Sequence, residues 1–164
     1  MIKLIVLDVD GTMTNGQIIY DETGNETKSF NVKDGLAIAV WTKILNKKCA
    51  IITGRISKIV QKRAKELNIT YTHQGVKDKL KLLQEICATE NIKLDEVAAI
   101  GDDLNDLSML KAVGISYAPK DAAKQIKKIA TKTTKKSGGD GAVREMIEHI
   151  LKQENSFHKF IDIW

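Results

Sequence analysis

Two carboxylates, Asp8 and Asp10, lie two residues apart at the end of the apolar run 4–7, and a second acidic segment, 101–106, follows the apolar run 98–100. If both runs are strands of an open parallel sheet, their carboxyl ends meet at one edge and bring the acids together. Clustered carboxylates raise each other's pKa unless a cation neutralises them. Because oxygen ligands of this kind suit Mg2+, the sequence predicts a Mg2+-dependent enzyme that acts on phosphate.

The composition is that of one soluble globular domain spanning residues 1–164, with 43% hydrophobic and 29% charged residues. Lysine plus arginine number 26 against 21 acidic residues, a net charge of +5 that favours small anions only weakly. Aromatic residues make up 5%, too few to favour nucleic-acid binding through a basic, aromatic stripe. No stretch approaches 18 apolar residues, so we expect no membrane span.

Cys49 and Cys87 are the only cysteines, and they do not form a C-x-x-C pair. Each lies inside an apolar or helical pattern, so we expect reduced core residues and a cytoplasmic protein. The chain begins directly with a short strand pattern and without the features of a secretory signal.

Apolar periodicity alternates between strand and helix along the chain. We expect strands at 2–7, 49–52, 69–72, 97–100 and 114–118, and helices at about 35–46, 57–67, 77–90, 105–112, 122–130 and 142–152. This alternation predicts an α/β fold with a parallel sheet covered by helices on both faces.

One segment departs from that alternation. Residues 17–20 and 27–30 resemble two strands around a polar, glycine-bearing turn, so we expect a β-hairpin flap over 13–31. Since it follows the first acidic loop, it should cover the site or contact another subunit; a simple excursion from the sheet is the alternative. The apolar content of the tail 153–164 indicates that it packs against another surface, and a neighbouring subunit is one candidate for that surface.

Four short motifs follow one another in the order found in the haloacid dehalogenase superfamily. They are Asp8–Thr12 (D-x-D-G-T), Thr53 at the end of the strand 49–52, Lys79, and Gly101–Asp106. The chain resembles that superfamily, and the resemblance implies a Rossmann-like fold and a phosphotransferase that forms an aspartyl-phosphate.

The resemblance assigns the nucleophile to Asp8. Asp10, on the same side of an extended chain, would protonate the leaving alcohol and then deprotonate the attacking water. Thr53 and Lys79 would hold the phosphoryl oxygens, and Gly11 would let main-chain N–H groups face the phosphate.

The resemblance also assigns the Mg2+ ligands. They are the Asp8 carboxylate, the backbone carbonyl of Asp10 and the Asp102 carboxylate, with waters and a phosphate oxygen completing an octahedron. Asp103 and Asp106 would orient these ligands; for Asp106, a role as an acid at a helix N-terminus remains an alternative.

Longer segments resemble one subfamily, the 3-deoxy-D-manno-octulosonate 8-phosphate phosphatases. These segments are 15–18, 28–35, 52–57 and 138–145, within a match over 2–152. The resemblance implies lipopolysaccharide sugar synthesis, no large cap domain, and a homotetramer in which neighbouring subunits complete each site. Beyond the catalytic set, the expected substrate-binding residues are Gly11, Thr12, Lys33, Asp34, Gly35, Gly54, Arg55 and Arg63.

Arg55 bears on the choice of sugar. A related branch that acts on nine-carbon, sialic-acid-type 9-phosphates often has glutamate there, whereas an arginine fork suits a substrate carboxylate. Arg63 would reach a neighbouring subunit's pocket, or would simply be an exposed helix residue. Lys33, where many relatives have arginine, keeps the charge but loses the fork.

Three other functions remain open. The chain can be a sialic-acid-type 9-phosphate or broad sugar phosphatase, a non-catalytic interaction subunit, or a nucleic-acid-binding module based on the late lysines. The intact acidic motifs, Thr53 and Lys79 oppose the non-catalytic alternative. The lysines late in the chain are more simply a solvated helix face and loop.

Overall fold

The computed structural model describes residues 1–162 and contains a six-stranded parallel sheet in the order β5-β4-β1-β6-β7-β8. The strands are β1 Leu4–Leu7, β4 Lys48–Ile52, β5 Tyr71–His73, β6 Val97–Ile100, β7 Ile115–Ala118 and β8 Lys132–Thr133. Each successive strand of this sheet is reached through at least one helix, which confirms the predicted α/β architecture. No large cap domain is present among the described residues.

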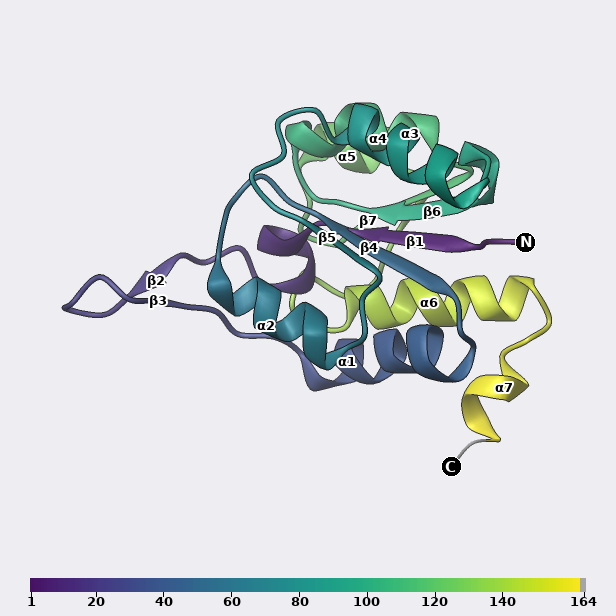
Figure 1. The fold of residues 1–164 in the computed structure, drawn as a ribbon, viewed down its shortest axis with the longest axis horizontal. Helices are drawn as coiled ribbons and strands as arrows, with labels where there is room; N and C mark the ends of the chain where they lie inside the picture. The colour runs from purple at the N-terminus through teal and green to yellow at the C-terminus, as the bar shows by residue number, and fades with distance from the viewer. Residues whose placement is uncertain (163–164) are drawn as a thin grey trace.

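Helices cover both faces of the sheet (Figure 1). One layer holds α3 Lys79–Glu90, α4 Leu107–Ala112 and α5 Lys124–Ile129; the other holds α1 Val32–Ala39, which continues as a wider turn over Val40–Ile44, with α2 Lys58–Glu66 and α6 Ala142–Gln153. Short 3-10 turns, Leu94–Glu96 and Leu104–Asp106, precede β6 and α4. Among the described residues, no helix has the length and apolar character needed to cross a bilayer.

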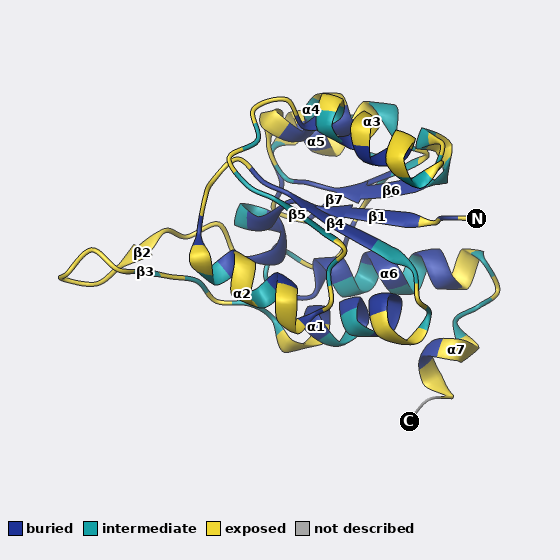
Figure 2. Ribbon diagram, in the orientation of Figure 1, coloured by how far each residue is buried: buried dark blue, intermediate teal, exposed yellow. Residues whose placement is uncertain are grey.

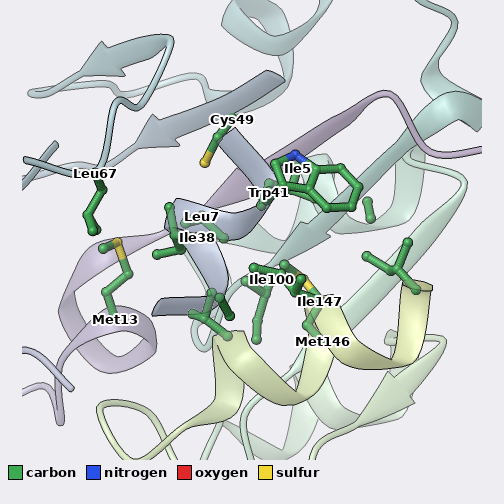
Figure 3. Packing of buried hydrophobic residues seen from close by; sticks show 14 of the residues in the cluster. Ile5, Leu7, Met13, Ile38, Trp41, Cys49, Leu67, Ile100, Met146 and Ile147 are labelled. Carbon is green, nitrogen blue, oxygen red and sulfur yellow. The ribbon is translucent and has the colours of Figure 1, made fainter. Parts of the chain in front are cut away.

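The strand β1 is buried along its whole length (Figure 2). Its side chains alternate between two cores on opposite faces of the sheet. Ile5 and Leu7 pack in the core beneath α1 and α6, where Trp41, Met146 and Ile147 also lie (Figure 3). Leu4 and Val6 face the opposite core, which α3, α4 and α5 cover. This double burial fixes the register of β1 and therefore the position of the acids that follow it.

Side-chain caps fix where several helices begin. The Asn31 side chain accepts hydrogen bonds from the backbone N–H groups of residues 33 and 34 at the start of α1, and Ser57 caps α2. Asp78 accepts a hydrogen bond from the backbone of Lys81, 3.0 Å away, so α3 begins at Lys79 rather than at 77. The cap thus places Lys79, which is buried, in the first turn of α3.

The predicted hairpin is present and extends away from the body of the molecule (Figure 1). Its strands, β2 Ile19–Tyr20 and β3 Glu26–Thr27, are shorter than the predicted 17–20 and 27–30. Asp21 closes the turn by accepting from both the backbone and the side chains of Thr23 and Asn25. Gly24 supplies the positive φ of 83° that this turn needs.

The structure departs from prediction at both ends of the sheet and in the tail. β5 starts two residues later than predicted, and β8 was not predicted because it has only two residues. In the tail, α7 His158–Ile161 buries Phe160 in the core beneath α6, so this segment packs on its own chain. Residues 163 and 164 of that tail lie outside the described residues.

Candidate active site

The topology brings the acidic loops together. β1 pairs with β4 on one side and β6 on the other. The strands β4 and β5 are added on one side of β1, and β6, β7 and β8 on the other, so the strand order switches at β1. Ligands of open α/β sheets bind beyond the carboxyl ends of strands at such a point. Asp8 follows β1 directly, and its N–H donates to Ile100 O at 3.1 Å, which ties the first acidic loop to the end of β6.

The loop after Asp8 is one wide turn closed by a hydrogen bond from Thr14 N–H to Val9 O at 3.0 Å. Gly11 lies within it at a φ of 94°, a conformation that favours glycine. A Cβ on Gly11 would collide with the carboxylate of Asp102. Glycine at this position therefore lets the two acidic loops approach each other.

Three carboxylates and one ammonium form the centre of the site. Asp8, Asp102 and Asp106 each present an oxygen within 4.8 Å of the others. Lys79 Nζ lies 2.7 Å from Asp8 Oδ1 and 2.6 Å from Asp106 Oδ1. The side chains of Asp8, Asp106 and Lys79 are all at most 5% exposed, so solvent screens these charges little.

The charges in this cluster do not balance. Burial, together with the Asp106 charge, raises the pKa of Asp8 to about 8 even though Lys79 opposes the shift. Burial and Asp106 likewise raise the pKa of Asp102 to about 6. Burial disfavours the charged form of Lys79, but the adjoining carboxylates prevail and raise its pKa. An all-oxygen set with three carboxylates and a single ammonium fits a divalent cation such as Mg2+.

Asp106 orients the cluster, because both of its carboxylate oxygens are already engaged. One accepts from Lys79, and the other accepts the backbone N–H groups of Asp102 at 3.0 Å and Asp103 at 3.3 Å. Its position favours the orienting role over that of a simple helix-terminal acid. The Asp103 side chain is exposed and accepts from Leu104 N–H, so it influences the centre chiefly through its charge.

Thr53 and its neighbours come from the end of β4. Thr53 is buried, its N–H donates to His73 O at 3.0 Å, and its carbonyl accepts from Val76 N–H. Thr12 is also buried, and its hydroxyl lies 3.4 Å from Asp102 Oδ1. Gly54 has open space around its Cα, since a Cβ on this residue would lie 3.8 Å or more from its nearest neighbours.

Arg55 lies between the catalytic loop and the hairpin. Its guanidinium is 2.8 Å from Glu26 Oε1 and 3.7 Å from Asp10 Oδ2. Lys28, the partner of Asp10 Oδ1, is a functional candidate that the sequence reasoning missed. The available signal was the two-residue spacing of Glu26 and Lys28, which places both side chains on one side of an extended strand.

Asp34, Gly35 and Arg63 form a different group on the α1 side, without a hydrogen bond or ion pair to the acidic centre among the described residues. Asp34 accepts from Arg144 N–H at 2.7 Å and so caps α6; burial raises its pKa to about 6. Gly35 leaves room for the Arg63 guanidinium, which packs over Phe30.

Lys33 lies apart from Arg63. It is exposed and lines a hollow of about 340 Å³ together with Lys135, Lys136 and Arg144. Its substrate-binding role therefore stays a prediction that depends on how a substrate or a neighbouring chain occupies this side of the molecule.

The glycine-rich segment 138–141 packs against the catalytic loop. Gly139 N–H donates to Thr12 O at 3.1 Å, and Gly138 N–H donates to Asp121 Oδ1 at 2.9 Å. A Cβ on Gly138 would collide with the carbonyl of Gly11. The segment is thus fixed against the loop by hydrogen bonds and close backbone contact.

Comparison with known proteins identifies this arrangement. A family model described as haloacid dehalogenase-like hydrolase matches residues 50–147. The chain belongs to the haloacid dehalogenase-like hydrolases. It is 42% identical over 151 residues to 3-deoxy-D-manno-octulosonate 8-phosphate phosphatase from Yersinia pestis, and the match covers 92% of this chain and 80% of that protein. The chain is accordingly a phosphatase of this family.

Solved structures agree with the assignment. The crystal structure of 3-deoxy-D-manno-octulosonate 8-phosphate phosphatase from Moraxella catarrhalis, in complex with magnesium ion, phosphate ion and KDO molecule, is 44% identical and superposes with a TM-score of 0.95 over 99% of this chain and 92% of that chain. The cobalt-bound form of the Haemophilus influenzae enzyme is 34% identical, with a TM-score of 0.89 over 95% of this chain and 91% of that one.

Proposed function

We propose that this phosphatase hydrolyses 3-deoxy-D-manno-octulosonate 8-phosphate to the free sugar acid and inorganic phosphate, for lipopolysaccharide sugar synthesis. The observation that carries the proposal is the convergence of Asp8, Lys79 and Asp102 at one sheet edge, in a chain similar to the Yersinia pestis and Moraxella catarrhalis enzymes of that name. Residues 1–164 act as one domain, with the hairpin 13–31 as a flap and 153–164 as a tail.

The residues divide the reaction into two displacements. A carboxylate oxygen of Asp8 attacks phosphorus, and the bond from phosphorus to the sugar oxygen breaks as Asp10 gives that oxygen a proton. Water then attacks the aspartyl-phosphate, Asp10 takes a proton from it, and Asp8 is released with inorganic phosphate. Lys79 and Thr53 hold the phosphoryl oxygens, and the turn at Gly11 lets main-chain N–H groups face them.

The donor set for Mg2+ consists of the Asp8 and Asp102 carboxylates and the Asp10 backbone carbonyl. Asp106 remains with Lys79 and the backbone, and Asp103 stays at the rim. When bound, Mg2+ supplies positive charge that favours the ionised nucleophile and neutralises the transferring phosphoryl group.

Arg55 is the proposed recognition group for the sugar carboxylate. Its side chain is 45% exposed, so a ligand can reach it, and its fork can bind a carboxylate bidentately. Gly54 permits close approach beside it. We assign Lys33, Asp34, Gly35 and Arg63 to the assembled site, where Arg63 serves a neighbouring subunit.

Phosphate release tests the catalytic proposal. With Mg2+, the wild-type chain should release phosphate from 3-deoxy-D-manno-octulosonate 8-phosphate, and Asp8→Asn should abolish release because the nucleophile is lost. Asp95→Asn removes an exposed carboxylate and serves as the matched control. Inert wild-type protein would refute the function, and a clear preference for a nine-carbon acid 9-phosphate would refute the choice of sugar.

We also propose a cytoplasmic homotetramer. The exposed apolar side chains of Ile18, Ile19 and Tyr20 on the hairpin support subunit contact. The free, buried thiols of Cys49 and Cys87 fit a reducing compartment. Sedimentation equilibrium tests the assembly, and a monomer at assay concentration would contradict the shared site.

A further inference from the structure

The base of the hairpin is joined to the catalytic loop by a closed ring of alternating charges. Lys28 Nζ contacts Asp10 Oδ1 and lies 3.2 Å from Glu26 Oε1. Arg55 lies 2.8 Å from the same Glu26 oxygen and 3.7 Å from Asp10 Oδ2. Two carboxylates thus alternate with two cations around the ring.

Lys28 differs from an ordinary surface lysine. Its side chain is 1% exposed, although it belongs to a hairpin whose other side chains are largely exposed. A buried ammonium is costly unless it is paired, and here two carboxylates share it. Glu26 and Lys28 lie on the same side of an extended strand, whereas Thr27 between them is exposed. The hairpin therefore directs Lys28 at Asp10 of the catalytic loop, and Glu26 at Lys28 and Arg55.

The two oxygens of Asp10 have different surroundings. Lys28 holds Oδ1, while Oδ2 is buried and accepts no hydrogen bond from the described residues. Arg55 approaches Oδ2 without hydrogen-bond geometry. A carboxyl group that transfers a proton needs a fixed orientation and one oxygen that remains free for the substrate. The contact from Lys28 fixes the orientation and leaves Oδ2 without a hydrogen-bond partner. The atoms around Oδ2 cover it in this structure, so the sugar oxygen must displace a neighbour such as the partly exposed Arg55 side chain to reach it.

We propose that Lys28 is a positioning residue that orients Asp10 for proton transfer and docks the hairpin on the catalytic loop. The inference rests on the proposed function, in which Asp10 is the general acid and base. As the bond from phosphorus to the sugar oxygen breaks, its electron pair goes to that oxygen, which takes the proton from Asp10 Oδ2 while the Asp8–phosphorus bond forms. Lys28 keeps its own protons throughout.

The leaving group distinguishes orientation of Asp10 from general support of the fold. A sugar alcohol leaves poorly unless it is protonated, whereas 4-nitrophenol leaves as a stable anion without a proton. A defect in general acid catalysis therefore slows formation of the aspartyl-phosphate far more with the sugar phosphate than with 4-nitrophenyl phosphate, whereas hydrolysis of the aspartyl-phosphate is the same step for both. A loss of folded enzyme slows both substrates equally.

The experiment compares the single-turnover rate constants for release of the sugar acid from 3-deoxy-D-manno-octulosonate 8-phosphate and of 4-nitrophenol from 4-nitrophenyl phosphate, at saturating substrate and Mg2+. Asp10→Asn should lower the rate constant for the sugar phosphate by about 10²–10⁴-fold, the usual contribution of general acid–base catalysis. Lys28→Met should lower it by roughly 10-fold, a part of the full contribution of Asp10, while the rate constant for 4-nitrophenol release changes by less than about 3-fold. Lys28→Arg should recover part of the loss on the sugar phosphate.

Two controls isolate the contact. Lys65→Met removes an exposed charge on α2, and Asp21→Ala loosens the hairpin turn without touching Asp10; both should leave the ratio of the two single-turnover rate constants unchanged. If Lys28→Met slows both substrates equally, or if Asp21→Ala shifts the ratio as strongly, the positioning role is wrong. If Asp10→Asn itself leaves the ratio unchanged, the proposed acid is wrong, and the inference fails with it.

Discussion

The acidic edge of the sheet and the hairpin beside it hold their functional groups in opposite ways. At the edge, Asp8, Lys79 and Asp106 are buried, and Gly11 and Gly138 bring backbone into direct contact. The hairpin has two-residue strands and exposed side chains, and salt bridges attach it to the body. The backbone therefore fixes the groups proposed to transfer phosphate, whereas side-chain ion pairs place the groups proposed to contact the leaving sugar.

The largest test of this contrast exchanges one glycine at a time. Gly11→Ala should lower kcat by at least about 10²-fold, because its Cβ would displace the Asp102 carboxylate and a displacement of about 1 Å has that effect. Gly24→Ala at the hairpin tip has a similar positive φ but meets nothing within 4 Å, so it should keep kcat within about 2-fold. Steady-state phosphate release measures both, and equal losses would remove the contrast.

The edge should also respond to pH and metal together. Asp8, with its pKa raised from 3.8 to about 8, binds a proton in the folded chain that the unfolded chain has lost between about pH 4 and 8. Metal-free stability from this group therefore falls as pH rises through that range, and Mg2+ replaces the proton. Thermal unfolding should show a larger Mg2+-induced rise in Tm at pH 8 than at pH 6. In Asp8→Asn this difference should shrink, and a pH-independent rise would contradict the assignment of the metal ligand.

On the hairpin side, Arg55→Ala should raise KM for the sugar acid phosphate by roughly 10-fold, which corresponds to the loss of one charged hydrogen bond. The change should be modest because Glu26 already shares the guanidinium. KM for 4-nitrophenyl phosphate, which has no carboxylate, is the internal control and should stay unchanged. Equal increases for both substrates would place Arg55 on the phosphate instead of the sugar acid.

The same contrast explains what could be predicted from sequence. Acids at strand ends meet because parallel pairing and double burial leave one register for β1, so Asp8 and Asp102 were predictable from the periodicity. Ser57 was predictable as a cap, because capping is local. The helix around residue 79 was predicted. The ion pair between Lys79 and Asp106 could not be predicted, because only the folded structure brings the two side chains together.

The remaining features depend on tertiary contacts. Lys28 was one of 26 basic residues, and only the folded hairpin shows its side chain buried against Asp10. Asp34 was expected at the substrate, which stays a prediction, but the hydrogen bond that it accepts from the backbone of Arg144, more than a hundred residues later in the chain, could not be predicted. β8 is too short for periodicity, and the tail lacks a pattern that distinguishes its own core from a neighbour.

We expect the smallest effect on activity from substitutions in the tail 153–162, which belongs to neither the acidic edge nor the hairpin. Phe160 is 2% exposed within the core beneath α6, with Arg144 packed over its ring. Phe160→Ala should lower the free energy of unfolding by about 3 kcal/mol, the low end for a buried phenylalanine, because the short α7 can adjust. Ile161→Ala, at a residue that is 53% exposed, should change the free energy of unfolding little. Denaturant unfolding measures both variants.

For both variants, kcat should stay within about 2-fold of the wild-type value, because the acidic edge does not depend on the tail. A large fall in kcat for folded Phe160→Ala would show that the tail contributes to the site.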